Sequence, residues 1–337
     1  MKHQLHAVAV TVSVLAAVPT AGCAGAPGSP PVRGAASAPA TGAAATRVAA
    51  SAAANAQVSG GSACAGAPNS SVTHTVEVAG KVRTFIAHLP AGPAPGAKVP
   101  AIIAFPGRGE DAGRLEAYSG LDAVDAVVLY AQGLDGKGGK PSWEATPYLG
   151  AEAHDYEFAG DLVRWLAGSG CVDPARIGLA GKSDGAGFAA SAGCTLDGVA
   201  TVATVSGAFY QDVNHCSGRG RPVATLNMHG TADPVIPYDG NPDRGLYSTD
   251  AWLRLWQQRD RCTGAGTDQD LAPDVTSTTW STCADSTVVV NYRIAGGGHT
   301  WPGASVSSGP GGTTHSIDAA RTILDFLDAH PRTPATG

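Results

Sequence analysis

Residues 176–194 read RIGLAGKSDGAGFAASAGC, and this stretch decides the fold. The strand-like run 176–180 leads into Gly181-Lys182-Ser183-Asp184-Gly185, a G-x-S-x-G pattern, and a run of small residues follows at 187–194. A strand, a sharp turn around a serine and a tightly packed helix are the parts of a nucleophile elbow, in which bulkier neighbours of the serine would clash. The setting therefore predicts an elbow at Ser183, with an ordinary glycine turn as the alternative.

Short apolar runs alternate with helical stretches around this elbow. The runs are 101–105, 126–131, 199–205, 223–228 and 288–294, and the helical faces carry Phe158, Leu162, Trp165 and Leu166, then Trp252, Leu255, Trp256 and Arg259, then Ile317, Ala320, Ile323, Leu324 and Leu327. We expect Ser316 to cap the last helix and Pro331 to stop it. The alternation predicts an α/β fold with a mostly parallel sheet and helices on both faces. Residues 73–89 alternate around Ala79-Gly80-Lys81 and predict an antiparallel hairpin before it.

An elbow predicts an acid and then a histidine, each just past a later strand. Asp233 follows the run 223–228, and His299 follows the run 288–294. Asp233 would accept the ring N–H of His299, which would take the proton of Ser183 and later return it. Taken singly, Asp233 is also a cap or turn residue and His299 a loop histidine. Their order and spacing together favour a Ser183, His299 and Asp233 triad in an α/β-hydrolase fold.

Two further sets of residues are candidates for the same site. Donors to a developing oxyanion are usually backbone N–H groups, and we expect them from Asp184 and from Arg108 or Gly107 in the turn at 105–109. Candidate walls of a substrate pocket are the aromatic residues Trp143, Tyr148, Trp301 and Phe209. Core positions are the alternative for these rings.

The first 63 residues are expected to lie outside the folded part. Residues 1–23 have a weakly basic start and an apolar run at 7–18, as a signal peptide does. The Ala-Gly-Cys ending resembles a bacterial lipobox, although Thr20 stands where that motif has Leu, so Cys23 is a lipidation candidate. Ordinary secretion, with cleavage near Ala24 or Ala26, is the alternative. Residues 24–63 predict a flexible linker or a passive leader, which leaves 64–337 as one domain.

Composition narrows the partners and cofactors. A 43% hydrophobic and 15% charged chain with a net charge of -6 and no Lys/Arg run is globular and excludes a nucleic-acid partner. No run is long enough to span a membrane, so membrane contact is expected only through a lipid anchor. Neither a metal nor an organic cofactor is expected, because no metal or dinucleotide motif is present. Six cysteines of an exported domain predict three disulfides: Cys64, Cys171, Cys194, Cys216, Cys262 and Cys283.

The chain resembles the secreted carbohydrate esterases of family one, the feruloyl and acetylxylan esterases, and the related polyhydroxybutyrate-depolymerase-like lipoproteins. The matching stretches are Cys64-Ala65-Gly66 with its hairpin, residues 171–177, the elbow at Ser183, residues 222–233 and residues 297–303. The resemblance implies Ser183 as nucleophile, Asp233 as acid and His299 as base, and the disulfides Cys64–Cys171, Cys194–Cys216 and Cys262–Cys283. The chain departs from the pattern at Pro106-Gly107, where relatives have His-Gly, and at Asp184.

The resemblance and the triad together predict a secreted serine esterase that acts on feruloyl or acetyl esters of plant polysaccharide. A hydrolase of polyhydroxybutyrate or other hydroxyalkanoate polyesters would use the same triad and is the first alternative. An inactive exported binding lipoprotein is the second. The sequence makes no prediction of the oligomeric state.

Overall fold

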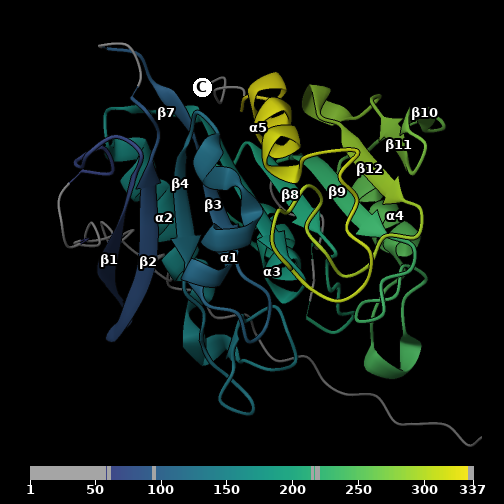
Figure 1. Ribbon diagram of the computed structural model, residues 1–337, viewed down its shortest axis with the longest axis horizontal. Coiled ribbons are helices and arrows are strands. Elements are labelled where there is room, and N and C mark those ends of the chain that lie inside the picture. The colour runs from purple at the N-terminus through teal and green to yellow at the C-terminus, as the bar shows by residue number, and fades with distance from the viewer. Residues whose placement is uncertain (1–57, 59–61, 93–95, 214–215, 217–220, 333–337) are drawn as a thin grey trace, which may run out of the picture. The chain divides into compact units, whose positions relative to one another are not determined.

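The fold is organised around one ten-stranded sheet (Figure 1). The computed structural model describes residue 58 and residues 62–92, 96–213, 216 and 221–332; the expected signal peptide, Cys23 and nearly all of the expected linker lie outside these residues. The sheet strands are β1 (Ser70–Val78), β2 (Lys81–Leu89), β3 (Val99–Phe105), β4 (Val127–Ala131), β7 (Val172–Lys182), β8 (Thr201–Val205), β9 (Ala224–Gly230), β10 (Thr267–Ala272), β11 (Val275–Trp280) and β12 (Val289–Ile294). A separate two-stranded sheet pairs β5 (Leu134–Asp135) with β6 (Pro141–Ser142).

The strand order places six parallel strands at the centre. It runs β1-β2-β4-β3-β7-β8-β9-β12-β11-β10. The neighbours from β4 to β12 pair in parallel, while β1, β2, β11 and β10 pair antiparallel at the two ends. A mostly parallel sheet with an antiparallel hairpin before it is the α/β-hydrolase arrangement expected from the sequence, and the predicted hairpin is β1 and β2.

Helices cover both faces of the sheet, as predicted. The α-helices of the described residues are α1 (Ala112–Ser119), α2 (Asp155–Gly168), α3 (Asp184–Gly193), α4 (Thr249–Arg259) and α5 (Ala319–Ala329). The short 3-10 helices are η1 (Leu121–Ala123), η2 (Ala151–Ala153), η3 (Pro242–Arg244) and η4 (Ala284–Ser286). In Figure 1, α1 and α5 lie in front of the sheet, and α2, α3 and α4 lie behind it.

The alternation of each central strand explains the two layers. In β3, Ile103 and Phe105 pack into the core on the side of α2, α3 and α4, whereas Ile102 and Ala104 pack toward α1 and α5. Because side chains alternate across a strand, a strand that is apolar on both sides needs helices on both faces. Every residue of β8 is buried for this reason.

Two local expectations are wrong. The last helix begins after Asp318, whose carboxylate accepts the N–H of Arg321 at 2.8 Å, so Asp318 and not Ser316 is the cap. The folded part also begins before Cys64, since Ala63 is 2% exposed and Val58 packs against the core. Apolar contacts of two small side chains decide this boundary, and the linker composition hides them.

Three disulfides join the described cysteines in the pairs Cys64–Cys171, Cys194–Cys216 and Cys262–Cys283, which are the pairs implied by the resemblance. The first ties the chain before β1 to the start of β7. The second links the end of α3 to a loop after β8, and the third spans the β10 and β11 hairpin. Of the helices among these residues, none has the length and apolar character needed to cross a membrane.

Candidate active site

Ser183 stands at a strained turn between β7 and α3. Its backbone has φ 55° and ψ -123°, a positive-φ conformation that residues other than glycine rarely adopt. A Cβ on Gly181 would lie 2.3 Å from the Gly185 carbonyl oxygen, and one on Gly185 would lie 2.1 Å from that of Phe105. Both glycines are thus required by the close backbone contacts of the bend. Such strain is held in place by surrounding structure and is typical of functional positions, so the geometry is that of a nucleophile elbow.

Asp233 and His299 are joined by a hydrogen bond. His299 Nδ1 lies 2.8 Å from Asp233 Oδ2, and both side chains are nearly buried. The other carboxylate oxygen, Oδ1, accepts the backbone N–H groups of Val235 and Ile236, each at 2.8 Å. Burial alone raises the pKa of Asp233, but the bonds from His299 and Ile236 hold it below its ordinary value. Asp233 is therefore an ionised acceptor that fixes the proton of His299 on Nδ1.

A second histidine, His229, also lies next to Asp233. His229, the last residue but one of β9, has its Nε2 2.9 Å from the carbonyl oxygen of Ile236 and 3.5 Å from Asp233 Oδ2. Burial lowers the pKa of His229, which favours a neutral ring that donates from Nε2. The sequence analysis did not select His229, although it stands at the end of the same strand that presents the acid.

The sheet brings the three triad candidates together at the carboxyl ends of its central parallel strands. Ser183 follows β7, Asp233 follows β9 and His299 follows β12, and these strands run parallel. The end of β8 contacts both the elbow and the loop that carries His299. The Ser183 N–H donates to the Val205 carbonyl at 3.0 Å, and Ser206 Oγ lies 3.5 Å from the Thr300 carbonyl oxygen. Within the described residues, no hydrogen bond joins the Ser183 hydroxyl to His299.

The turn after β3 lies against the elbow. A Cβ on Gly107 would lie 3.3 Å from the Ser183 Cβ. The Gly107 N–H donates to Glu110 Oε2 at 3.2 Å, whereas no hydrogen bond of the described residues uses the Arg108 N–H or the Asp184 N–H. This distinction favours Arg108 over Gly107 as the second oxyanion donor. The Asp184 N–H is at the start of α3, where the helix dipole favours negative charge.

Asp184 is a buried carboxyl group beside the nucleophile. The Tyr210 hydroxyl donates to its Oδ1 at 3.3 Å, and Oδ2 has no partner in the described part of the chain. Burial raises the pKa of Asp184 to about 6, although the bond from Tyr210 and the nearby charge of Arg108 oppose the rise. Arg108 in turn lies over the ring of Tyr148, 4.0 Å from its centre.

The predicted pocket aromatics are mostly core residues, so that prediction is wrong for three of the four. Trp301, Trp143 and Phe209 are 0%, 1% and 1% exposed. Trp143 stacks on Phe188, and its Nε1 donates to the Pro106 carbonyl at 2.9 Å; Phe209 stacks on Trp252. Rings without exposed surface cannot form a pocket wall. Tyr148 is half-buried and lines a surface hollow of about 580 Å³ with Thr146, Leu149 and Glu152.

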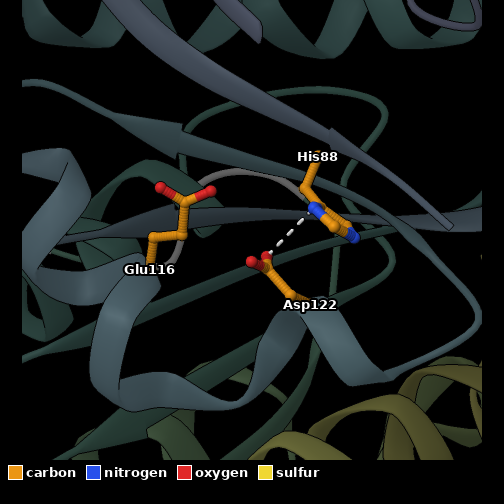
Figure 2. Close-up of side chains that lie close together, drawn as sticks. All are labelled: His88, Glu116 and Asp122. Atoms are coloured by element: carbon orange, nitrogen blue, oxygen red, sulfur yellow. Dashed lines mark ion pairs between the residues drawn. The ribbon is translucent and has the colours of Figure 1, made fainter. Parts of the chain in front are cut away.

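One group of described side chains could hold a metal ion, and it lies apart from the catalytic candidates. Figure 2 shows His88 of β2, Glu116 of α1 and Asp122 of η1, whose ligand atoms lie within 4.8 Å of one another. Ser71 already bonds to both His88 and Glu116, and the Tyr130 hydroxyl donates to Asp122 at 2.6 Å. These hydrogen bonds account for the cluster as a polar network between strand and helix.

The parallel sheet, the serine elbow and the acid–histidine pair define an α/β-hydrolase. The chain is 31% identical to "Putative esterase NocK" of Nocardia uniformis subsp. tsuyamanensis over 285 residues, 75% of this chain and 81% of that protein. It is 29% identical to Feruloyl esterase B of Piromyces equi over 186 residues, 52% of this chain and 34% of that protein. The chain belongs to the esterase family of this Nocardia protein, and it is a serine carboxylic-ester hydrolase.

The solved acetyl xylan esterase from Aspergillus awamori aligns with a TM-score of 0.47 and 14% identity, covering 72% of this chain and 94% of that one. The chain matches no protein-family model.

Proposed function

We propose that Ser183, His299 and Asp233 hydrolyse carboxylic esters through an acyl-enzyme. The observation that carries the proposal is the Asp233–His299 hydrogen bond of 2.8 Å at the sheet edge where the strained Ser183 stands. A carboxylate on Nδ1 leaves the Nε2 lone pair of His299 free to accept a proton. The order of the three residues along the chain is the α/β-hydrolase order.

In the first half of the reaction, His299 Nε2 takes the proton of Ser183 as Oγ attacks the ester carbonyl carbon. The carbonyl oxygen becomes an oxyanion, and the N–H groups of Asp184 and Arg108 are the proposed donors to it. The carbon–oxygen bond to the alcohol then breaks, and the alcohol leaves with the proton from His299. Asp233 stabilises the imidazolium formed between these events.

The second half repeats the chemistry with water. His299 removes a proton from water, whose oxygen attacks the acyl carbon on Ser183. The bond to Ser183 Oγ breaks, Oγ recovers the proton from His299, and the carboxylic acid leaves. Neither half needs a metal ion or an organic cofactor.

For the substrate we propose feruloyl or acetyl esters of plant polysaccharide. Support comes from the similarity to Feruloyl esterase B and from the half-buried Tyr148, which lines a surface hollow. The Tyr148 ring also contacts the guanidinium of Arg108 in the turn at 105–109, the proposed oxyanion turn. Ring contact of an aryl ester with Tyr148 replaces the contact with Trp301 that the sequence suggested. One apolar wall discriminates by about 10-fold to 200-fold between esters.

The test is a panel of methyl ferulate, acetylated xylan, p-nitrophenyl acetate and a hydroxybutyrate oligomer. We expect the highest kcat/KM on one of the first two. Ser183→Ala should lower turnover by about 10³-fold or more on every ester, and Asp239→Asn, an exposed residue outside the acid–histidine pair, should leave it unchanged. Wild-type turnover by folded Ser183→Ala would refute the nucleophile. Preference for the oligomer would replace the polysaccharide proposal with a polyesterase.

We also propose that the protein is exported as a single esterase domain, 64–337 extended slightly toward its N-terminus, behind the signal peptide 1–23 and the linker. Three disulfides support an oxidising compartment. Whether Cys23 carries a lipid is tested by the mass of the mature N-terminus and by fractionation of a Cys23→Ser variant. Loss of membrane association in that variant alone supports the anchor, and an unmodified mature chain beginning after Cys23 refutes it.

A further inference from the structure

A buried cation lies directly behind the nucleophile. Lys182, the residue before Ser183, is 2% exposed, and its Nζ lies 3.3 Å from Glu110 Oε1. Its other charged neighbours are Arg114, which opposes its charge, and Asp233, which favours it. A lysine ammonium is strongly hydrated and rarely buried without a partner, so the ion pair with Glu110 is what allows this position.

Glu110 is also bound to the oxyanion turn. Its second oxygen, Oε2, accepts the Gly107 N–H at 3.2 Å and the Tyr118 hydroxyl at 2.8 Å. The Glu110 N–H donates back to the Gly107 carbonyl at 3.0 Å and closes the turn. The carboxylate is therefore held on both oxygens and fixes the Pro106–Gly107 peptide, while the bond from the Glu110 N–H to the Gly107 carbonyl fixes the next peptide, which carries the Arg108 N–H.

The same lysine lies close to Gly309, in the segment that packs on the backbone of His299. A Cβ on Gly309 would lie 3.4 Å from Lys182 Nζ and 2.0 Å from the His299 carbonyl oxygen. Lys182 thus lies where the oxyanion turn, the elbow and the His299 loop meet. Three loops of the proposed site share one buried charge.

We infer that Lys182 and Glu110 are positioning residues for the oxyanion site. The pair holds Gly107 turned toward Glu110, so that the next N–H along the chain, that of Arg108, is the one presented to substrate. Lys182 also cancels the negative charge of Glu110, which would otherwise oppose a negative oxygen forming close by. The inference rests on the proposed Ser183 mechanism and adds to it the residues that set the oxyanion geometry.

This role differs from simple stabilisation in what it predicts. A misplaced oxyanion donor weakens binding of the transition state and leaves binding of the substrate nearly unchanged. Complete loss of one donor costs about 10²-fold to 10³-fold in turnover. For a displaced donor we expect about 10-fold to 100-fold in kcat, with KM changed by less than about twofold.

The experiment compares Lys182→Met, Glu110→Gln and the double variant on p-nitrophenyl acetate, with inhibition by a short trifluoromethyl ketone measured on each. The ketone forms an oxyanion when Ser183 adds to it, so its Ki should rise by the factor by which kcat falls. Lys182→Met, which leaves a lone carboxylate, should lose more than Glu110→Gln. Adding Glu110→Gln to Lys182→Met should restore part of kcat, because it removes that charge.

Controls separate the inference from the mechanism and from folding. Arg321→Met breaks an exposed ion pair with Asp325 on α5 and should leave kcat and Ki unchanged. Tyr118→Phe removes only one hydroxyl from Glu110 and tests the network if the charge variants fold poorly; it should lower kcat about 3-fold to 10-fold. The inference would be overturned if the two single decreases in kcat added up in the double variant. It would also be overturned if KM increased while the Ki of the ketone stayed unchanged. Activity in Ser183→Ala would instead refute the mechanism itself.

Discussion

The Tyr210 hydroxyl donates to Asp184 at 3.3 Å, and this is the one hydrogen bond that the described residues give to the carboxylate next to the nucleophile. Tyr210 in turn packs edge-on against Tyr148. A carboxyl group with a single weak partner is costly to ionise when buried. The consequence is a measurable dependence of stability on pH.

Asp184→Asn should gain stability relative to wild type as the pH rises. The pKa of Asp184 in the native state is about 6, above its ordinary value, so the native protein binds this proton more tightly than the unfolded chain. The stability that the protonated Asp184 contributes is present below the ordinary pKa of an aspartate and is lost as the pH rises through 6. The asparagine variant does not ionise here, so it avoids this decrease in the free energy of unfolding, which reaches about 3 kcal/mol. Urea unfolding at pH 4.5 and 8 measures the difference, and the exposed Asp135→Asn should show none.

Asp233→Asn should lower kcat about 10³-fold to 10⁴-fold while the protein stays folded. The amide oxygen can still accept both bonds from the backbone N–H groups of Val235 and Ile236, but the amide no longer provides the negative charge that orients and stabilises the His299 ring. Steady-state kinetics on p-nitrophenyl acetate measure the loss. The exposed Asp243→Asn is the matched control, and equal activity of the two variants would assign the acid elsewhere.

Trp301→Ala should destabilise the protein and affect all esters alike. The Trp301 ring is fully buried and packs near Tyr118 of α1, with ring centres 6.1 Å apart. Removal of a buried tryptophan leaves a cavity that costs about 3 to 5 kcal/mol. Denaturant unfolding and the ratio of rates on methyl ferulate and p-nitrophenyl acetate test this. A selective loss on the aryl ester would return Trp301 to the substrate pocket.

Removal of the Cys64–Cys171 disulfide should cost more stability than removal of either other disulfide. It closes a loop with a sequence separation of 107, against 22 and 21 for the others. Chain entropy predicts about 4 to 5 kcal/mol for the long loop and about 3 kcal/mol for the short ones. Paired Cys→Ala variants compared by unfolding in urea test the order. A larger loss for the Cys262–Cys283 pair would show that local contacts outweigh loop length.

Arg83→Met should destabilise the fold by about 3 to 5 kcal/mol, because it leaves Asp155 as an unpaired buried charge. The two side chains have no exposed surface, and their charged atoms lie 2.6 Å apart. Arg83 also lies over the ring of Phe158, which the methionine can still cover. Guanidinium unfolding measures the loss, and Arg321→Met, which breaks the exposed ion pair with Asp325, should cost less than about 1 kcal/mol.

The sequence was enough to place Ser183, Asp233 and His299 on one edge, because each follows an apolar strand and parallel strands end together. It also indicated both faces of the sheet, since strands such as β8 are apolar throughout. Such inferences depend on periodicity and chain order, which a single sequence displays directly.

Other parts could not be read in this way. Trp301 follows His299 by two residues in a loop, where no period tells which side chains turn inward. The bond between Glu110 and Lys182 joins residues that are 72 positions apart in the chain. Lys182 occupies a variable position of the G-x-S-x-G pattern, so the pattern does not predict a partner for it. Helix α1 and the hairpin of β10 and β11 were missed because they are short and partly polar.

The polar strand β10 has a consequence for how the sheet ends. Five of its six residues are exposed, and Asp268 and Asp270 accept hydrogen bonds from the Thr278 and Thr276 hydroxyls of β11. An unpaired strand edge can recruit another chain into the sheet, and charged side chains oppose this. A second molecule that approached this edge would meet two fixed carboxylates. The β10 edge of the sheet is therefore protected against pairing with the strand of another chain.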